Sequence, residues 1–242
     1  MADNLKSKSI TANIEKIRTA IPNNVVIVAA SKTRTVDEIK QVILCGIKDI
    51  GGNYVQEAEA KYNVLKEFLE EQKQKGCDVS NVRFHLIGHL QSNKAKKAVE
   101  IFDVIQTIDG VEIAKEVNKR AAAIGEIGKI IEVLIEVNIA NEANKHGCKL
   151  EDVEKIASEI LKLKNLKLVG LMTMGPLFEA GSHEQLRPYF KQMKQKFDEL
   201  NAKGFGFDLK YLSMGMSNSY HVAIEEGSNM VRIGSQIFGE RK

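Results

Sequence analysis

Runs of apolar residues alternate with amphipathic stretches along almost the whole chain. Residues 25–30 are apolar without interruption, and such a run predicts a strand that is buried on both faces, as in a parallel sheet. Ahead of this run, isoleucines recur at helical spacing from Ile10 to Ile21. They predict an amphipathic helix over residues 9–21 that ends at Pro22, with a loose polar segment before it.

Seven further apolar runs follow, and helical patterns separate them. The predicted strands after the first are residues 47–50, 83–87, 104–108, 130–139, 166–174, 209–214 and 230–233. The predicted helices start after Thr35, with Glu38 completing a capping box, and then cover residues 55–75, 94–101, 111–124, 150–163, 184–201 and a short segment ending at Glu226.

Eight strands that alternate with helices over 242 residues match a single (β/α)8 TIM-type barrel with an extra N-terminal helix, an α/β fold. A doubly wound open sheet is the competing arrangement. The barrel is favoured because eight units use the whole chain, and because no Gly-x-Gly-x-x-Gly turn follows the first strand. We therefore expect one domain over residues 1–242.

Composition narrows the functional classes. The 35 lysines and arginines nearly balance the 32 aspartates and glutamates, leaving a net charge of +3, so no global field favours nucleic acid or an acidic membrane. Cys45, Cys77 and Cys148 are far apart and lack metal-ligand spacing. Without a secretory leader or an apolar run of about 20 residues, we expect a cytoplasmic protein with reduced thiols.

Barrel proteins carry their working residues at the carboxyl ends of the strands. Lysine, amide and hydroxyl side chains are prominent at these ends. The residues there are Lys32, Asn53, His89, Gln91, Asp109, Asn138, Met172, Met174, Ser217, Asn218, Arg232, Gly234 and Ser235. Lys32 is either a solvated loop residue or a nucleophile. His85 and His89 straddle a strand end and a glycine turn, so they do not form a helical zinc pair, and we expect no metal site.

The loops after the seventh and eighth strands have the pattern of a phosphate site. Gly215-Met216-Ser217-Asn218 opens a helix, and Gly234-Ser235 follows the last strand. Such turns expose backbone N–H groups and a hydroxyl, and barrel enzymes often bind phosphate there. The alternative is that Ser217 only caps a helix and Gly234 only turns the chain.

Together, these features suit a phosphorylated aldehyde. A desolvated Lys32 would present a free amine that forms a Schiff base, and pyridoxal 5′-phosphate is the cofactor of that description. Arg232 lies two residues before Gly234 and faces the same way. Because arginine only donates hydrogen bonds, it would keep the pyridine nitrogen unprotonated and limit carbanion chemistry.

Six segments carry a resemblance to a known family. They are Ala30-Ser31-Lys32-Thr33, Asn53-Tyr54-Val55-Gln56-Glu57, the ten residues from His85 to Lys94, Gly170-Leu171-Met172-Thr173-Met174, Met214-Gly215-Met216-Ser217, and Val231-Arg232-Ile233-Gly234-Ser235 with Ile237-Phe238-Gly239. In these segments the chain resembles the pyridoxal-phosphate homeostasis proteins, also called proline synthase co-transcribed homologues. Their barrel is similar to the N-terminal domain of alanine racemase.

The resemblance implies a role for each matching residue. Lys32 would hold pyridoxal phosphate as a Schiff base, and Arg232 would face the ring nitrogen. The turn with Met216 and Ser217, together with Gly234 and Ser235, would bind the phosphate, and Asn53 would line the pocket. Two positions depart from the family pattern, since Gly52 and Ser219 stand where the family usually has acidic residues.

The resemblance implies a carrier in vitamin B6 homeostasis, without catalytic residues, that handles pyridoxal phosphate and passes it to apoenzymes. The alternative is an amino-acid racemase or another small pyridoxal enzyme. Racemisation needs a second base, and the extra alanine racemase domain is not expected after Ser235, although Tyr220 stays open. A Schiff-base aldolase would need an acid such as Asp109. A further role for Lys145 is also left open.

Overall fold

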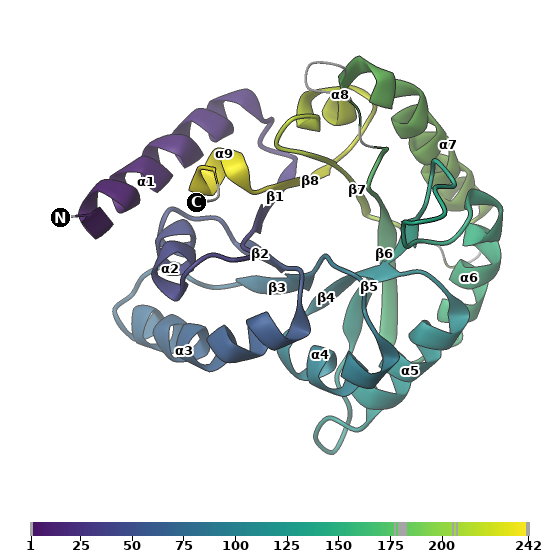
Figure 1. Cartoon of the computed structure of the whole chain (residues 1–242). Coiled ribbons are helices and arrows are strands. Elements are labelled where there is room, and N and C mark those ends of the chain that lie inside the picture. The colour runs from purple at the N-terminus through teal and green to yellow at the C-terminus, as the bar shows by residue number, and fades with distance from the viewer. Residues whose placement is uncertain (1, 177, 179–182, 205, 207, 241–242) are drawn as a thin grey trace.

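A computed structural model describes residues 2–176, 178, 183–204, 206 and 208–240. Eight parallel strands pair in chain order, and β8 closes on β1 to complete a barrel (Figure 1). The strands are β1 (Val26–Ala30), β2 (Asp49–Gly52), β3 (Arg83–Leu86), β4 (Val104–Ile108), β5 (Ile131–Val137), β6 (Leu166–Thr173), β7 (Tyr211–Met216) and β8 (Met230–Ile233). The predicted (β/α)8 barrel is confirmed.

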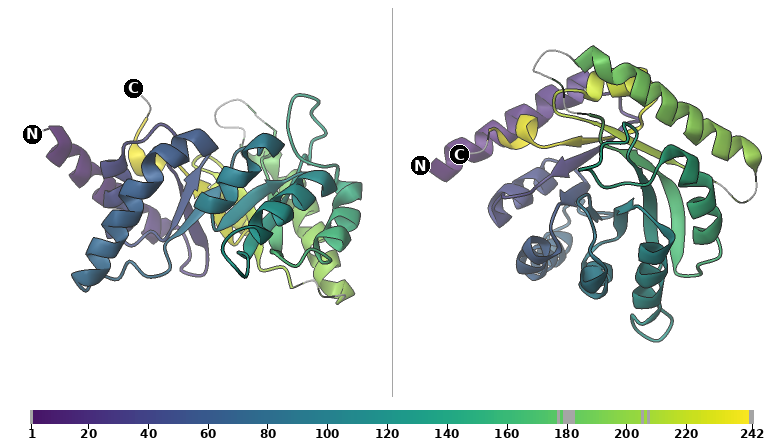
Figure 2. Two further views of the ribbon diagram at one scale, coloured as in Figure 1. Left: turned by 90° about the horizontal axis from the view of Figure 1, so that it is seen from below. Right: turned by 45° about the vertical axis from the view of Figure 1, so that its right-hand side comes forward.

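Helices surround the strands on the outside, as the views in Figures 1 and 2 show. The α-helices are α1 (Ala2–Ala20), α2 (Val36–Leu44), α3 (Val55–Gln74), α4 (Ala95–Ile101), α5 (Val111–Ala122), α6 (Val153–Ile160), α7 (Arg187–Lys203), α8 (Tyr220–Glu225) and α9 (Ser235–Phe238). Short 3-10 turns η1 (Ser92–Lys94), η2 (Leu150–Asp152) and η3 (His183–Leu186) precede α4, α6 and α7. Within the described residues, no helix is both long enough and apolar enough to cross a bilayer.

Two strands lie two residues later than the apolar pattern predicts. β2 was expected at residues 47–50, but Gly46 has a φ of 82° and the N–H of Ile47 bonds the carbonyl of Val42. These contacts make Ile47 part of the C-terminal cap of α2. The strand instead continues through Gly51 and Gly52, which pair with β3.

β7 was expected at residues 209–214. The side chain of Asn201 bonds both the N–H and the carbonyl of Leu209, which holds that residue outside the sheet. The strand therefore extends through Gly215 to Met216. Both corrections have the same cause, because apolar residues at an element boundary can belong to a cap, while glycines can pair in a sheet.

The N-terminal helix is longer than predicted, since α1 starts at Ala2 and not at Ser9. Its isoleucines Ile10, Ile14 and Ile17, and Ile21 just after it, are buried against the outside of the barrel. α1 also packs against α9, and the two lie side by side in Figures 1 and 2. The amide of Asn13 donates to the carbonyl of Ile237 at 3.0 Å, which joins the two ends of the chain. The four-residue helix α9 was not predicted.

The helix after β1 starts as the sequence predicts. Thr35 accepts a hydrogen bond from the N–H of Glu38, and the carboxylate of Glu38 accepts one from the N–H of Thr35. This capping box satisfies N–H groups that have no partner within the helix. It sets the point at which the segment containing Lys32 turns from the barrel into α2.

Candidate functional site

A cleft of about 330 Å³ opens at the carboxyl ends of β1 to β3 and β6 to β8. Its volume is in the range of small-molecule sites. The lining residues are Ala30, Lys32, Arg34, Asn53, Ile87, Met174, Pro176, Phe178, His183, Leu186, Met216, Ser217, Asn218, Ser219, Arg232, Gly234 and Ser235. The structure thus brings all seven residues of the predicted cofactor site into one cleft.

Lys32 enters this cleft from a short segment that is held at its start. Ser31 is buried, and both its N–H and its Oγ donate to the carbonyl of Gly51, at 2.8 and 3.0 Å. These bonds extend the β1–β2 pairing by one residue past Ala30. Lys32 is the next residue, so the end of the sheet determines where its backbone lies.

The two loops predicted to bind phosphate are joined to each other. The N–H of Gly234 donates to Oγ of Ser217 at 3.2 Å, and the side chain of Gln236 donates to the Ser217 carbonyl at 2.7 Å. Ser217 is 8% exposed. The Ser217 hydroxyl and the first N–H groups of α9 therefore lie on one side of the cleft. The N–H groups at the start of a helix have no acceptors within the helix.

The turn that carries Ser217 depends on glycine. Gly215 has a φ of 93°, and a Cβ there would lie 2.7 Å from Cβ of Ala223, so a side chain does not fit. Ser219, one of the two departures from the family pattern, accepts a hydrogen bond from the N–H of Met216 at 3.1 Å. Ser219 therefore stabilises the turn and also lines the cleft.

Arg232 forms the floor of the cleft. It is 4% exposed, and its guanidinium donates to Oγ of Ser213 at 2.7 Å and to the carbonyl of Thr173 at 2.8 Å. Burial lowers the pKa of Arg232 to about 10, against the opposing effect of Glu136. The group therefore stays cationic at neutral pH, and its orientation is set by neighbours on β6 and β7.

A chain of buried hydrogen bonds continues from Arg232 through the barrel. Oγ of Ser213 lies 2.7 Å from Oε1 of Gln106, Nε2 of Gln106 lies 3.0 Å from Nδ1 of His85, and Nε2 of His85 lies 2.8 Å from Oδ1 of Asp49. Arginine can only donate, so every group in the chain donates in the same direction, toward Asp49. His85 then carries its proton on Nε2, an assignment that follows from the network.

The chain ends in an ion pair at the opposite end of the barrel. Arg83 binds the carboxylate of Asp49 at 2.7 Å. Burial alone would raise the pKa of Asp49, but the hydrogen bonds and charges of His85 and Arg83 outweigh it and lower the pKa. Asp49 therefore stays anionic and can accept the hydrogen bond from Nε2–H of His85.

Glu136, near the end of β5, is a buried carboxyl that the sequence analysis did not single out. It is 2% exposed, and within the described residues its Oε2 accepts no hydrogen bond. Burial raises the pKa of Glu136 to about 7, with Asp109 adding to the rise and Arg232 opposing it. Its strand position in an apolar run, Ile135-Glu136-Val137, was the available signal.

The structure separates His85 from His89, as the sequence analysis expected. His85 is buried inside the barrel, whereas the ring of His89 stacks on His146 with 3.6 Å between centroids and 8° between planes. Nδ1 of His89 lies 3.4 Å from the Asp109 carboxylate. Candidate ligand atoms of His89, Asp109 and His146 lie within 4.8 Å of one another, but parallel rings do not direct their nitrogen lone pairs at one point.

Several candidate residues from the sequence do not line the cleft. Tyr220 packs on the outer core formed with α1 and α2. Asn138 instead organises the loop after β5, where its amide bonds the carbonyls of Glu142 and Lys145 and accepts from the N–H of Glu142. Lys145 donates to the carbonyl of Gly175 at 3.2 Å.

The apolar wall of the cleft was missed. It is formed by Ile87 and by side chains after β6, namely Pro176, Phe178 and Leu186. The signal available in the sequence was the long segment between the predicted strand 166–174 and the helix at 184. A connection of that length in a barrel is often functional.

Comparisons with known proteins show the family to which the chain is related. The chain matches the family described as alanine racemase, N-terminal domain, over residues 5–242. A pyridoxal phosphate homeostasis protein of Aquifex aeolicus is 38% identical over 216 residues, which are 89% of this chain and 87% of that protein. The protein of that name from Escherichia coli K12 is 35% identical over 223 residues, 91% of this chain and 87% of that protein.

Solved structures extend the similarity. PipY of Synechococcus elongatus PCC7942, solved with PLP bound, is 29% identical and superposes with a TM-score of 0.81 over 95% of this chain and 100% of that chain. An alanine racemase of Clostridium difficile 630 has a TM-score of 0.74 at 16% identity, over 97% of this chain and 60% of that one. At that identity the likeness concerns the fold alone.

Proposed function

Because this chain belongs to the pyridoxal phosphate homeostasis protein family, with the barrel of the alanine racemase N-terminal domain, we propose that it binds pyridoxal 5′-phosphate on Lys32. It holds and delivers this cofactor in the cytoplasm, without substantial catalysis, and apoenzymes are its recipients. The observation that carries the proposal is the convergence of Lys32, Ser217, Gly234 and Arg232 in one cleft.

The groups in the cleft fit the three polar parts of the cofactor. Lys32 would hold the cofactor through its aldehyde, because a primary amine condenses with an aldehyde to a Schiff base with loss of one water. Ser217 and the N–H groups at the start of α9 are hydrogen-bond donors for a phosphate. Arg232 is a cationic donor for a ring nitrogen.

The nature of Arg232 favours a carrier over an enzyme. Its guanidinium cannot take up the pyridine proton, so a ring nitrogen beside it stays unprotonated. The bonds to Ser213 and Thr173 hold it in one orientation. An unprotonated ring withdraws electrons weakly, which disfavours the carbanion chemistry that racemisation requires.

The residue considered as a second base for a racemase lies outside the described lining of the cleft. Tyr220, the residue left open for that role, is not among the lining residues and packs on the outer core. Pro176, Phe178 and Leu186 give the cleft an apolar wall, which would limit the access of water to a ligand bound there. Such exclusion slows hydrolysis of a Schiff base and suits a protein that retains its ligand.

Two measurements test the proposal. We expect the purified protein mixed with pyridoxal phosphate to develop a visible absorption band that Lys32→Ala abolishes; an unchanged band in the variant would refute the assignment of Lys32. Incubation of the loaded protein with L-amino acids in deuterated water separates carrier from enzyme. Loss of α-hydrogen at about 1 per second or faster would contradict the carrier role.

A further inference from the structure

The residue after Lys32 has an unusual backbone conformation. Thr33 has a φ of 64°, in the left-handed region. A β-branched residue adopts this region only when its surroundings impose it, and such residues concentrate at functional sites. The cause of this conformation therefore bears directly on how Lys32 is placed.

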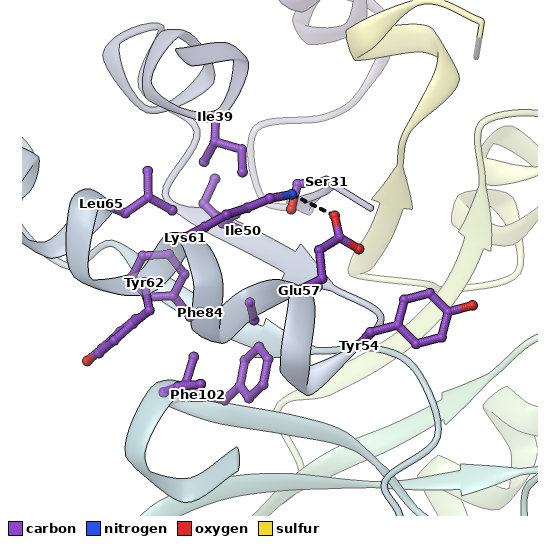
Figure 3. A pocket seen from close by; sticks show the side chains of 13 residues that line it. Ser31, Ile39, Ile50, Tyr54, Glu57, Lys61, Tyr62, Leu65, Phe84 and Phe102 are labelled. Carbon is purple, nitrogen blue, oxygen red and sulfur yellow. Dashed lines mark hydrogen bonds and ion pairs between the residues drawn. The ribbon is translucent and has the colours of Figure 1, made fainter. Parts of the chain in front are cut away.

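The surroundings that impose it are a tight turn and α3. The N–H of Arg34 donates to the carbonyl of Ser31 at 3.1 Å, so Thr33 is the third residue of a four-residue turn, where a positive φ occurs. Side chains of α3 hold this turn from outside. Oε1 of Glu57 accepts the N–H of Thr33 at 2.7 Å and a bond from Nζ of Lys61 at 2.6 Å, and the same Nζ donates to the carbonyl of Arg34 at 2.6 Å. Figure 3 shows Glu57 and Lys61 pointing toward one another from this helix. Their side chains are 26% and 18% exposed. The pair thus holds the chain on both sides of the Thr33–Arg34 peptide.

The other end of the segment is also fixed. Ser31 is bonded twice to Gly51, and the guanidinium of Arg34 donates to the carbonyls of Phe238 and Gly239. Lys32 lies between these attachments. A shift of its Cα would strain the bonds to β2, the turn bond between Ser31 and Arg34, or the bonds to α3.

The pocket beside the pair does not offer another explanation. It lies beneath α3, is lined mainly by apolar side chains such as Ile39, Leu65 and Phe102, and has a volume of about 30 Å³ (Figure 3). This volume holds about one water molecule. The pocket is a packing gap, and the polar groups at its edge face the Lys32 segment.

We propose that Glu57, oriented by Lys61, is a positioning residue that fixes Lys32 in the cleft by holding Thr33 in the left-handed conformation. The inference rests on the proposed attachment of pyridoxal phosphate to Lys32. A carboxylate in the first turn of a helix also stabilises the helix through its dipole. That general role would not depend on the conformation of Thr33, and this difference makes the two explanations separable.

The test measures the rate at which the visible band appears when pyridoxal phosphate is added to the apoprotein. We expect Glu57→Ala to slow the reaction about tenfold, because Thr33 relaxes and carries Lys32 away from its position. Glycine adopts a positive φ without strain. The double variant Glu57→Ala/Thr33→Gly should therefore recover at least half of the lost reaction rate, measured on a logarithmic scale.

Glu59→Ala is the matched control, since Glu59 lies on the same helix and pairs with Lys97 at the surface. It should leave the rate unchanged. Glu57→Gln, which keeps an oxygen acceptor for the Thr33 N–H, should stay within about threefold of the parent. If Glu57→Ala does not fold, as circular dichroism would reveal, Lys61→Met replaces it, with an expected slowing of about threefold that Thr33→Gly again reduces.

The outcomes distinguish this inference from the proposed function. If the parent protein forms no band, or if Lys32→Ala keeps it, the proposed function fails. If the band depends on Lys32 but Glu57→Ala reacts at the parent rate, the positioning role is wrong. A double variant as slow as Glu57→Ala would likewise overturn it and leave only a structural role for Glu57.

Discussion

Two sides of the barrel mouth carry polar residues, and they differ in how those residues are arranged. On the side of β7, β8 and β1, donors from separate loops converge on one cleft, and Arg232 and Ser217 are held by bonds to neighbouring strands and loops. On the side of β3 to β5, His89 and His146 stack in parallel beside Asp109. A position at a strand end is therefore not sufficient to make a binding site. The cleft side differs from the other side because its polar groups converge and are held in fixed orientations.

The two sides also differ in charge. The cleft contains Lys32 and Arg232, whereas the other side contains Asp109 and the buried Glu136. Glu136 is affected by both, since Asp109 raises its pKa and Arg232 lowers it. The cationic side suits a phosphorylated ligand. The acidic side increases the cost of placing a second anion there.

Among the variants that test this comparison, Arg232→Met should show the largest effect. We expect affinity for pyridoxal phosphate to fall about a hundredfold, because a charged hydrogen-bond donor is lost, at about 1.5–3 kcal/mol. Absorbance titration gives the affinity. Arg83→Met, at the opposite end of the same hydrogen-bond chain, is the control; an equal loss of affinity there would show a general effect of destabilisation.

Glu136→Gln should change how stability depends on pH. The folded-state pKa of about 7 lies above the ordinary value of 4.5, so the folded protein binds more protons between these values, and the parent loses stability as pH rises from about 4.5 to 7. The difference in unfolding free energy between the variant and the parent should therefore shift in favour of the variant by on the order of 2 kcal/mol between pH 4.5 and pH 8. Urea unfolding at both pH values measures this, and parallel curves would contradict it.

Ser217→Ala should weaken binding of pyridoxal phosphate about tenfold, equivalent to about 1.4 kcal/mol, since the variant loses a phosphate donor and the link to Gly234. Competition by inorganic phosphate should weaken in parallel. Ser80→Ala, on an exposed turn that bonds Asp78, is the control. An unaltered phosphate competition would locate the phosphate elsewhere.

His89→Ala should have the smallest effect on the affinity for pyridoxal phosphate. Exposed ion pairs contribute about 0–1 kcal/mol to stability, and His89 is outside the cleft lining. Affinity for pyridoxal phosphate should change less than twofold by the same titration. A loss comparable to that of Ser217→Ala would mean that both sides of the barrel mouth act in binding, and the comparison would no longer hold.

Much of the fold follows from local pattern. The apolar runs predict all eight strands, and the Thr35–Glu38 spacing predicts the start of α2, because burial and capping are properties of neighbouring residues. The ends of β2 and β7 were misplaced by two residues. There, Val42 and Asn201 bind backbone groups of Ile47 and Leu209, and no apolar pattern encodes those bonds.

Local pattern in the chain is enough to predict the barrel and to place candidate residues at strand ends, which meet at one mouth, and the family resemblance selects from these candidates the seven residues proposed for the cofactor. The contacts that fix those residues are visible only in the folded chain. The bond from Ser213 to Gln106 and that from Thr33 to Glu57 join positions far apart in the chain. Their geometry depends on strand register and on where α3 packs, and neither follows from the residues adjacent to Lys32 or Arg232.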